Sequence, residues 1–391
     1  MKRKLGILCS HPIQYYSPLF RHLANTTDID LKVYYCHKPS PDQQGTGFGV
    51  AFSWDVDLTG GYENIWLKNV ARQPNLVDFG GCDTPEIAEI IRRDEFNAFL
   101  ILGWDKKSMW QAIRACWKYD TPLLVRGDSH LHVQIPFYKK LGKELSHRYF
   151  IPKFSACLAV GQWSKEYFEH YGAKNIFMSP HFVDNEWFAK ELLRWKPLSD
   201  KIKKEWKISL GTIVFLFVGK FEEKKRPMDI LWALKRILKK NRTMLERLRV
   251  LMVGDGVLKK GCEKFALLNS LPVTFTGFLN QSQISKAYSV SDVLVLPSDG
   301  RETWGLVVNE AMACGLPAIV TDQVGCGPDL IKWGRTGFIF RCGDTKDLAD
   351  KMELFLVNGG SEINQENIEH HIAHYSMENA AEGIFKTLGA A

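Results

Sequence analysis

Two glutamates that could bind a sugar, Glu302 and Glu310, stand eight residues apart around the run Thr303-Trp304-Gly305-Leu306. Glu310 falls in an apolar stretch, where burying a carboxylate is costly unless a donor hydrogen-bonds to it. Neighbouring sugar hydroxyls are suitable donors, because a carboxylate accepts two hydrogen bonds side by side. Gly305 lets a ligand approach the backbone, and amide N–H groups at a helix start favour an anion. The pattern therefore predicts a site for a phosphate that carries a sugar.

The elements around this run are predicted from its flanks. The apolar run Asp292–Leu296 indicates a strand before it, and Leu306–Cys314 indicates an almost wholly buried helix. Gly315 can end that helix and Pro317 prevents its continuation, while Thr303 is expected to cap its start. The alternative is an ordinary strand–turn–helix connection, with the first glutamate solvated and the second satisfied inside the core.

Two lysines form a second group of candidate residues. Lys220 and Lys225 follow the apolar run Thr212–Val218 and the glycine at position 219. Two cations at the end of a strand suit a diphosphate leaving group. A lysine-rich turn is more often a solvated charged surface. Here the buried strand before the turn and the five-residue spacing favour phosphate binding.

The run between the glutamates resembles a known signature. It is similar to the E-x7-E motif of the retaining glycosyltransferases of family 4, which have the GT-B fold, and Trp304 stands where phenylalanine is usual. The resemblance implies that Glu302 meets the donor hexose and that Glu310 holds the ribose of the nucleotide.

The lysine turn is similar to a second family pattern, which reads Gly-Arg-Leu, three residues, Lys-Gly. Lys220 takes the arginine position, Lys225 the lysine position, and Arg226 replaces the last glycine. Lysine lacks the bidentate hydrogen-bonding fork of arginine, so weaker binding of phosphate is expected. In relatives the backbone after the glycine that corresponds to Gly277 contacts the base. The resemblance thus gives catalytic roles to Glu302, Lys220 and Lys225, and donor binding to Gly219, Phe278, Thr303, Trp304, Gly305, Leu306 and Glu310.

Strand-like and helix-like segments alternate through both halves of the chain. This alternation predicts parallel sheets covered on both faces, with ligands at the carboxyl ends of the strands. In the first half the predicted strands are Leu5–Cys9, Leu31–Cys36, Ile65–Lys68, Ala98–Leu102, Leu123–Arg126, Ala156–Val160 and Ile176–Met178. The predicted helices there are Leu19–Ala24, Pro85–Arg93, Lys107–Lys118, Phe137–Tyr149 and Ser164–Tyr171. In the second half further strands begin at Thr212, Leu248, Val273, Asp292, Ala318 and Gly337, and helices span Asp229–Lys239, Gln283–Val290, Leu306–Cys314, Thr345–Leu356 and Ala380–Leu388.

Polar side chains follow two early strands of the first half. His11 and Gln14 come after the first strand, where the family usually has two glycines against the diphosphate. Without those glycines, the two side chains are expected to reach the acceptor or the donor instead. Trp104 follows the strand Ala98–Leu102 and is a candidate wall of the acceptor site.

A third strand end, Arg126 to His130, carries candidates for a catalytic role. Family members often have a histidine at this strand end, near the transferring sugar. Arg126 takes that position here, and either Asp128 or His130 is expected to replace the histidine. The alternative is that each of these side chains simply structures its loop.

The resemblance implies two Rossmann-like domains that face each other across a cleft, and 391 residues are enough to form them. Residues 1–185 are expected to bind the acceptor and residues 186–375 the nucleotide-sugar. Residues 376–391 are expected to form a helix that crosses back to the first domain. Ser179–Phe188 resembles the family's interdomain segment, and a mobile glycine-rich loop is expected over Pro39–Gly61.

Composition sets broad limits on what the protein is. Apolar residues make up 45% and charged residues 24% of the chain, as in soluble globular proteins. The net charge of +7 suits anionic ligands or an acidic membrane surface. Nine cysteines without regular spacing indicate buried thiols in a reducing compartment. The apolar run Leu5–Cys9 is too short for a signal sequence, and no apolar segment approaches the ~20 residues of a membrane span, so a cytoplasmic location is expected.

The predicted helix Phe137–Phe150 is both basic and rich in aromatic residues. Its apolar stripe of Tyr138, Leu141, Leu145 and Tyr149 is expected to face the core, as in an ordinary surface helix. The alternative is a peripheral contact with anionic lipid at the inner face of the membrane, since basic amphipathic helices lie on such surfaces.

The resemblance implies a retaining, metal-independent glycosyltransferase. It would move a hexose from a UDP- or GDP-sugar to a hydroxyl of a carbohydrate or lipid-linked acceptor, in polysaccharide or glycolipid assembly, without a further cofactor. The pairs Asp28 and Asp30, and Asp55 and Asp57, match the DxD motif of metal-using transferases, but they are expected to be loop charges. The base, the hexose, the acceptor and the oligomeric state stay open.

Three alternative functions are weighed against this one. A GT-B nucleotide-sugar epimerase would also bind a UDP-sugar but would need acid–base residues opposite the anomeric carbon. A non-catalytic GT-B partner subunit would not be expected to keep Glu302, Glu310, Lys220 and Lys225 together. A nucleic-acid binder would be expected to show a basic stripe with stacking aromatic residues, which this sequence lacks.

Overall fold

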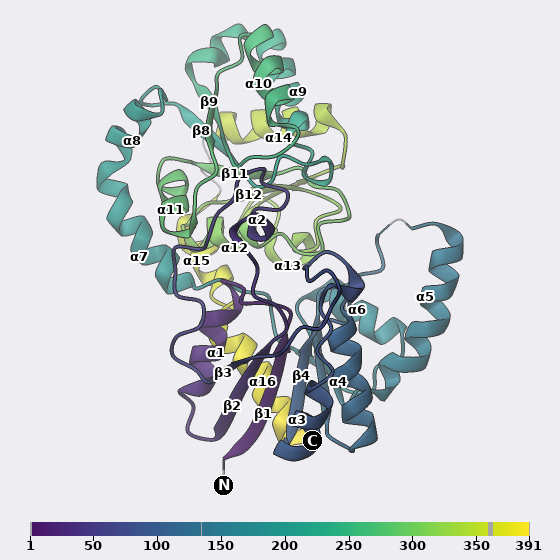
Figure 1. Cartoon of the computed structure of the whole chain (residues 1–391). Coiled ribbons are helices and arrows are strands. Elements are labelled where there is room, and N and C mark those ends of the chain that lie inside the picture. The colour runs from purple at the N-terminus through teal and green to yellow at the C-terminus, as the bar shows by residue number, and fades with distance from the viewer. Residues whose placement is uncertain (1, 134, 359–362, 391) are drawn as a thin grey trace. The chain divides into compact units, whose positions relative to one another are not determined.

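The computed structural model describes residues 2–133, 135–358 and 363–390, and the chain divides into two compact units (Figure 1). The first unit comprises Met1–Gln44, Val56–Phe182 and Ser376–Ala391, and the second comprises Gly45–Asp55 and Val183–Tyr375. Each unit has one parallel sheet with helices, so each is an α/β structure.

The first unit contains a seven-stranded sheet in the order β3-β2-β1-β4-β5-β6-β7. Its strands are β1 (Arg3–Cys9), β2 (Ile29–Tyr35), β3 (Asn64–Trp66), β4 (Ala98–Leu102), β5 (Leu123–Gly127), β6 (Ala156–Ala159) and β7 (Ile176–Met178). Its helices are α1 (Tyr16–Ala24), α2 (Pro41–Gln44), α3 (Ile87–Asp94), α4 (Lys107–Lys118), α5 (Phe137–Phe150), α6 (Gln162–His170) and α16 (Met377–Ala390). The last helix packs against α1, β6 and β7.

The second unit contains a six-stranded sheet in the order β10-β9-β8-β11-β12-β13. Its strands are β8 (Ile213–Val218), β9 (Leu248–Val253), β10 (Val273–Gly277), β11 (Val293–Leu296), β12 (Ala318–Thr321) and β13 (Gly337–Phe340). Its helices are α7 (Asn185–Trp195), α8 (Ser199–Glu205), α9 (Pro227–Lys240), α10 (Lys259–Leu268), α11 (Gln281–Ser289), α12 (Leu306–Ala313), α13 (Gly327–Leu330), α14 (Thr345–Asn358) and α15 (Gln365–Ile372). Strands β9 and β10 lie on one side of β8, and β11 to β13 lie on the other. The strand order therefore reverses between β8 and β11, and ligands of such sheets bind at this kind of switch point.

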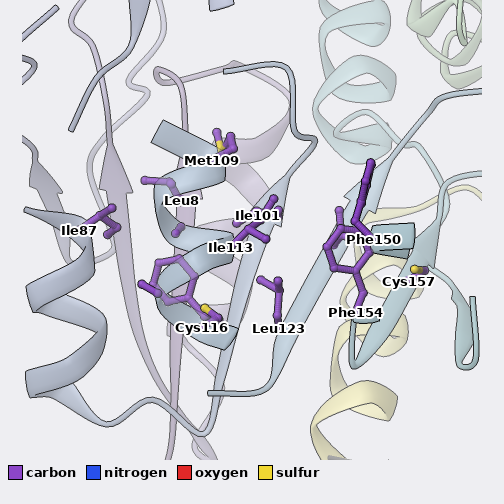
Figure 2. Packing of buried hydrophobic residues seen from close by; sticks show 14 of the residues in the cluster. Leu8, Ile87, Ile101, Met109, Ile113, Cys116, Leu123, Phe150, Phe154 and Cys157 are labelled. Carbon is purple, nitrogen blue, oxygen red and sulfur yellow. The ribbon is translucent and has the colours of Figure 1, made fainter. Parts of the chain in front are cut away.

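Apolar periodicity explains how the helices cover the sheets. Helix α4 buries Met109, Ile113 and Cys116, which share one face because they are four and three residues apart. These side chains belong to the same buried cluster as Ile101 on β4 and Leu123 on β5 (Figure 2). The strands are apolar on both faces, as expected of parallel sheets covered by helices on both sides.

Several elements differ from the sequence-based predictions. Helices α7, α10, α13 and α15 have no counterpart among the predicted helices. In α10, lysines and Gly261 interrupt the apolar pattern, and Cys262 and Ala266 are its buried residues. The glycine-rich loop contains α2, and its part from Gly45 to Asp55 belongs to the second unit.

The predicted burial of the apolar stripe of α5 is wrong. Tyr138, Leu141, Leu145 and Tyr149 are 70%, 50%, 68% and 68% exposed, and Phe150 at the end of the helix is the buried residue. Exposed apolar side chains in such a row indicate a contact surface.

A buried arginine on β5 is hydrogen-bonded to residues near the end of the segment Val56–Phe182 of the first unit. The side chain of Arg126 is 1% exposed. Its Nη2 donates to the carbonyls of Ser179 at 3.0 Å and Pro180 at 2.9 Å, and its Nε donates to Ser179 Oγ at 3.1 Å. Its Nη1 donates to Tyr16 Oη at 2.9 Å. These bonds satisfy the guanidinium, which would otherwise be very costly to bury.

Replacing Arg126 with methionine should lower the free energy of unfolding by about 3 kcal/mol or more, because buried carbonyls lose charge-assisted donors. Urea unfolding followed by circular dichroism measures this loss. The control is Arg92→Met, whose side chain is exposed and pairs with Glu89 within α3. That variant should unfold at the wild-type urea concentration. Equal unfolding midpoints for the two variants would contradict the structural role of Arg126.

Candidate functional site

An ion pair joins the two loops that carry the predicted catalytic residues of the second unit. Lys225 lies in a short 3-10 turn, Glu223–Lys225, after β8, and Glu302 lies in the loop after β11. Lys225 Nζ is 2.5 Å from Glu302 Oε2, and the two side chains are 11% and 12% exposed. The structure therefore brings together two residues that are 77 positions apart in the chain and that the sequence assigns to one site.

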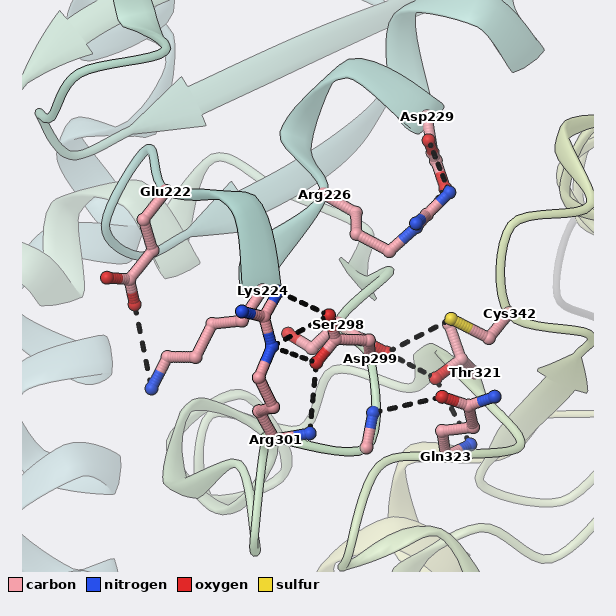
Figure 3. Close-up of polar contacts among 11 residues, drawn as sticks. Glu222, Lys224, Arg226, Asp229, Ser298, Asp299, Arg301, Thr321, Gln323 and Cys342 are labelled. Atoms are coloured by element: carbon pink, nitrogen blue, oxygen red, sulfur yellow. Dashed lines mark hydrogen bonds and ion pairs between the residues drawn. The ribbon is translucent and has the colours of Figure 1, made fainter. Parts of the chain in front are cut away.

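Backbone bonds fix the loop after β11 on both sides. The amide of Asp299 donates to the carbonyl of Lys224 at 2.8 Å, next to the lysine turn. Towards β12, Gly300 N donates to Gln323 Oε1 at 3.0 Å and Thr321 Oγ1 donates to the carbonyl of Ser298 at 2.6 Å (Figure 3). Because the loop is held at three points, the carboxylate of Glu302 has a defined position at the strand ends.

Arg226, which stands where the resembled pattern has glycine, adopts a left-handed conformation with φ of 47°. Glycine adopts this conformation most easily, so the local backbone geometry matches the pattern although the residue does not. The Arg226 guanidinium donates to Asp229 Oδ2 at 2.7 Å and so points along the start of α9 (Figure 3). The pair of Arg226 and Asp229 therefore holds the end of the lysine turn, and the side chain of Lys225 points to Glu302.

The turn before α12 depends on a glycine. Gly305 has φ of 101°, and a Cβ there would lie 2.8 Å from Leu296 Cδ2 and 3.2 Å from Val324 Cγ1. Thr303 was expected to occupy the cap position of α12, but Gly305 occupies it and makes no side-chain cap hydrogen bond. Thr303 itself is half-buried, and Leu306, also half-buried, is the first residue of α12.

Trp304 and Glu310 are both held inside the second unit. The Trp304 indole is buried and its Nε1 donates to Asn309 Oδ1 at 2.8 Å. Glu310 is 3% exposed, and Tyr288 Oη donates to its Oε2 at 2.5 Å. Tyr288 thus supplies one of the donors that a buried carboxylate requires.

Lys220 follows Gly219 at the end of β8, but its ammonium is in contact with the segment Gly45–Asp55. Its Nζ donates to the carbonyl of Thr46 at 2.7 Å and lies 4.9 Å from the centre of the Phe48 ring. Burial lowers the pKa of Lys220 below its usual value. The ring of Phe48 also packs on Phe278 after β10, with centroids 5.0 Å apart.

A pocket of about 290 Å³ lies at the carboxyl ends of β4 and β5 in the first unit. It brings together three predicted residues, Trp104, Arg126 and Asp128. His181 also lines it, with Nε2 at 4.0 Å from Asp128 Oδ2. Burial, followed by the nearby Arg126 charge, lowers the pKa of His181 well below its usual value, which favours the neutral imidazole.

His181 and Tyr16 are pocket residues that the site prediction lacked. His181 belongs to the segment that resembles an interdomain connection, and its position three residues after β7 is the signal that could have found it. Since the carboxyl ends of parallel strands meet at one edge of a sheet, a polar residue after β7 belongs with those after β4 and β5.

The other predicted residues of the first unit lie outside this pocket's lining. His130 is buried against Trp163, with ring centroids 5.2 Å apart, and burial lowers its pKa to about 4. His11 shares a hydrogen bond of 2.9 Å with Ser10 Oγ, and burial together with His37 and Lys106 lowers its pKa to about 4. Gln14 is half-buried between β1 and α1.

A family model of known proteins matches most of the second unit. The model of the family "Glycosyl transferases group 1" matches residues 199–372. Both Glu302 and Lys225 lie within the matched residues.

Curated relatives match parts of the chain. The chain is 42% identical over 123 residues to a sulfoquinovosyl transferase of Arabidopsis thaliana, covering 31% of this chain and 23% of that protein. It is 33% identical over 168 residues to N-acetyl-alpha-D-glucosaminyl L-malate synthase of Bacillus anthracis, covering 42% and 41%. It is 28% identical over 235 residues to D-inositol 3-phosphate glycosyltransferase of Rhodococcus erythropolis, covering 57% and 51%. The chain thus spans between about a quarter and a half of these relatives' lengths.

Solved structures are similar over nearly the whole chain. A glycosyltransferase from Rickettsia africae has a TM-score of 0.73 at 15% identity, covering 99% of this chain and 98% of that one. The Anabaena protein HepE has a TM-score of 0.69 at 15% identity, covering 100% of both chains. With the two parallel sheets, these similarities confirm the predicted GT-B fold.

Within residues 2–133, 135–358 and 363–390, no helix combines the length and the apolar character needed to cross a membrane. In the same ranges, no cluster of three or more His, Cys, Asp or Glu side chains is arranged to hold a metal ion.

The pairing of Lys225 with Glu302 can be tested by a double-mutant cycle. Lys225→Met alone should cost about 3–5 kcal/mol of unfolding free energy, because it leaves a buried carboxylate without its partner. Adding Glu302→Gln to the same chain should restore most of that loss. Urea unfolding of the wild type, both single variants and the double variant measures the coupling.

The control cycle uses Lys224 and Glu222, which are 3.5 Å apart in the same turn but 37% and 30% exposed. Their coupling should be much smaller, since solvent screens exposed pairs. Losses that simply add for Lys225 and Glu302 would show that the close approach of the two groups does not stabilise the protein.

Proposed function

We propose that the protein transfers a hexose from a nucleoside-diphosphate sugar to an acceptor hydroxyl, with retention of the anomeric configuration. The observation that carries the proposal is the buried pair of Lys225 and Glu302, which lies at the strand ends of a group 1 domain. A cation and a carboxylate beside each other suit a ligand that presents both phosphate oxygens and sugar hydroxyls.

In the proposed reaction, the bond between the anomeric carbon and the diphosphate oxygen breaks and the acceptor oxygen forms the new bond on the same face. The acceptor proton passes to the leaving phosphate. Lys225 and Lys220 stabilise the charge that develops on that phosphate, and Glu302 orients the hexose. An ammonium has three donors, so Lys225 can keep Glu302 as a partner and still bind phosphate oxygen. The proposal assigns the neutralising charge to these lysines, without a metal ion.

Glu310 is proposed to hold the ribose. Tyr288 donates to one of its carboxylate oxygens, at 2.5 Å. Structures of HepE with UDP and with UDP-glucose support UDP-sugars as the first donors to test, alongside GDP-sugars.

The pocket of the first unit is proposed to bind the acceptor. Trp104 offers an apolar wall, while Asp128 and His181 offer polar groups that can bind the hydroxyls of a carbohydrate or of a lipid-linked sugar. The pocket volume of about 290 Å³ accommodates a small sugar-sized group. Polysaccharide or glycolipid assembly is the proposed context.

Replacing Glu310 with glutamine tests the donor site. The amide oxygen can still accept the bond from Tyr288, so the fold should persist, while nucleotide affinity should fall by about tenfold, because a charged acceptor is lost. Calorimetry with UDP-, GDP- and ADP-sugars measures binding to the wild type and the variant. Glu369→Gln, at an exposed position of α15, is the control and should bind like the wild type.

Unchanged affinity in Glu310→Gln would remove Glu310 from the donor site, and a wild type that binds no nucleotide-sugar would contradict the proposed function. Product analysis completes the test: transfer requires the acceptor, whereas epimerisation of the donor sugar without any acceptor would identify an epimerase. Binding of a nucleotide-sugar without turnover, whichever acceptor is added, would favour a non-catalytic partner subunit.

The exposed face of α5 is proposed to rest on anionic lipid. Its apolar row is flanked by Lys139, Lys140 and Arg148, which are all exposed. Lysines beside an exposed apolar row complement both the headgroup charge and the acyl region of an anionic membrane. All nine cysteines lie in the described residues and are free, which agrees with a cytoplasmic location at the inner face of a membrane.

Vesicle flotation tests this contact. The wild type should float with vesicles that contain anionic lipid and less with neutral vesicles, while Leu145→Gln/Tyr149→Gln should float less with both, because it removes exposed apolar area. The control is Leu267→Gln/Leu268→Gln on α10, two apolar side chains that are also largely exposed. Equal flotation of both double variants would contradict the proposed contact of α5 with lipid.

A further inference from the structure

The segment Gly45–Asp55 belongs to the second unit, although the residues before and after it belong to the first. We call this segment the strap. It lies over the carboxyl ends of three neighbouring strands, with contacts to Lys220 after β8, Gly256 after β9 and Phe278 after β10. This is the sheet edge at which the donor site is proposed.

The far end of the strap is fixed to the start of α11. Asn280 Nδ2 donates to the carbonyl of Ser53 at 2.8 Å. The amide of Ser282 donates to Asp55 Oδ1 at 3.1 Å, and its hydroxyl donates to Asp55 Oδ2. Asp55, which formally matches a metal motif, is therefore used to anchor the strap. An acidic side chain is favourable at this helix start.

Three aromatic rings form a cluster between the strap and β10. The centroids of Phe52 and Phe278 are 4.4 Å apart, those of Phe48 and Phe278 are 5.0 Å apart, and those of Phe48 and Phe52 are 5.6 Å apart. All three rings are half-buried, so each keeps part of its surface in solvent. Exposed aromatic surface of this kind accepts the face of a nucleobase.

The near end of the strap fits closely around Lys220. A Cβ on Gly47 would lie 2.9 Å from Lys220 Cδ and 3.1 Å from its Nζ. The carbonyl of Thr46 takes one of the three ammonium donors. Two donors stay available for phosphate oxygens, and the ring of Phe48 limits where the ammonium can move.

We propose that the strap is a working part of the nucleotide site: it positions the Lys220 ammonium for the diphosphate and, with Phe278, forms the aromatic surface on which the base lies. This inference rests on the proposed function, because it assumes a nucleoside-diphosphate donor. Lys220 contacts the phosphate, while Thr46 and Phe48 act through it as positioning residues.

Two glycines of the strap provide a matched test. Gly47 and Gly49 have similar backbone angles, with φ of 86° and 72°, so alanine strains the backbone in a similar way at both. At Gly47 the added Cβ meets Lys220, whereas no described residue lies within 4 Å of a Cβ at Gly49. Gly47→Ala should therefore weaken nucleotide binding by about tenfold, and Gly49→Ala by no more than about twofold.

The measurement is calorimetry with UDP, GDP and ADP on the full chain, followed by both variants with the nucleotide that binds the wild type most tightly. A second pair of measurements separates the base from the phosphates. Phe52→Leu should weaken that nucleotide but leave inorganic pyrophosphate, measured as a competitor, at its wild-type affinity. A merely structural role of Phe52 would change both ligands together.

Amide hydrogen exchange of residues 45–55 is measured on the wild type, so the result does not depend on whether a variant folds. Added nucleotide should slow exchange in the strap of the wild type. Equal or tighter binding by Gly47→Ala compared with Gly49→Ala, or strap exchange that nucleotide leaves unchanged or speeds up, would overturn the inference while leaving the donor proposal intact. A wild type that binds none of the three nucleotides would overturn both.

Discussion

The ion pair between Lys225 and Glu302 is the interaction on which the candidate site depends. Both side chains are largely buried, so removing either partner would leave a costly unpaired charge. The pair also connects the loops after β8 and β11, the neighbouring strands at the centre of the second sheet. A ligand that presents an anion to the lysine and hydroxyls to the carboxylate would suit this pair, as the proposed sugar phosphate does.

Backbone geometry maintains that pair. Gly305 turns the chain into α12 where a side chain would collide with Leu296 and Val324, and the amide of Asp299 holds the loop to the lysine turn. Arg226 adopts the left-handed conformation that closes the turn on the other side. These are constraints of the backbone, which explains how the geometry can persist where the side chains depart from the family pattern.

Two buried polar groups, one in each unit, are matched to partners. Glu310 accepts from Tyr288, and Arg126 donates to two carbonyls and two side-chain oxygens. Arg126 both stabilises the fold and lines a pocket. Its guanidinium is hydrogen-bonded within the first unit, and the pocket lies beside it. A change at such a residue affects stability and binding together, so the two need separate measurements.

The sequence by itself determined the alternation of strands and helices, the E-x7-E run and the lysine turn, because these depend on residues close together in the chain. It did not determine that α5 exposes its apolar row, since periodicity shows that a helix has two faces but not what covers them. Nor did it reveal that His181 joins Asp128, or that the strap joins the second unit, because both contacts connect distant parts of the chain. Tertiary structure alone decided these, since side chains far apart in sequence meet only after the sheets have formed.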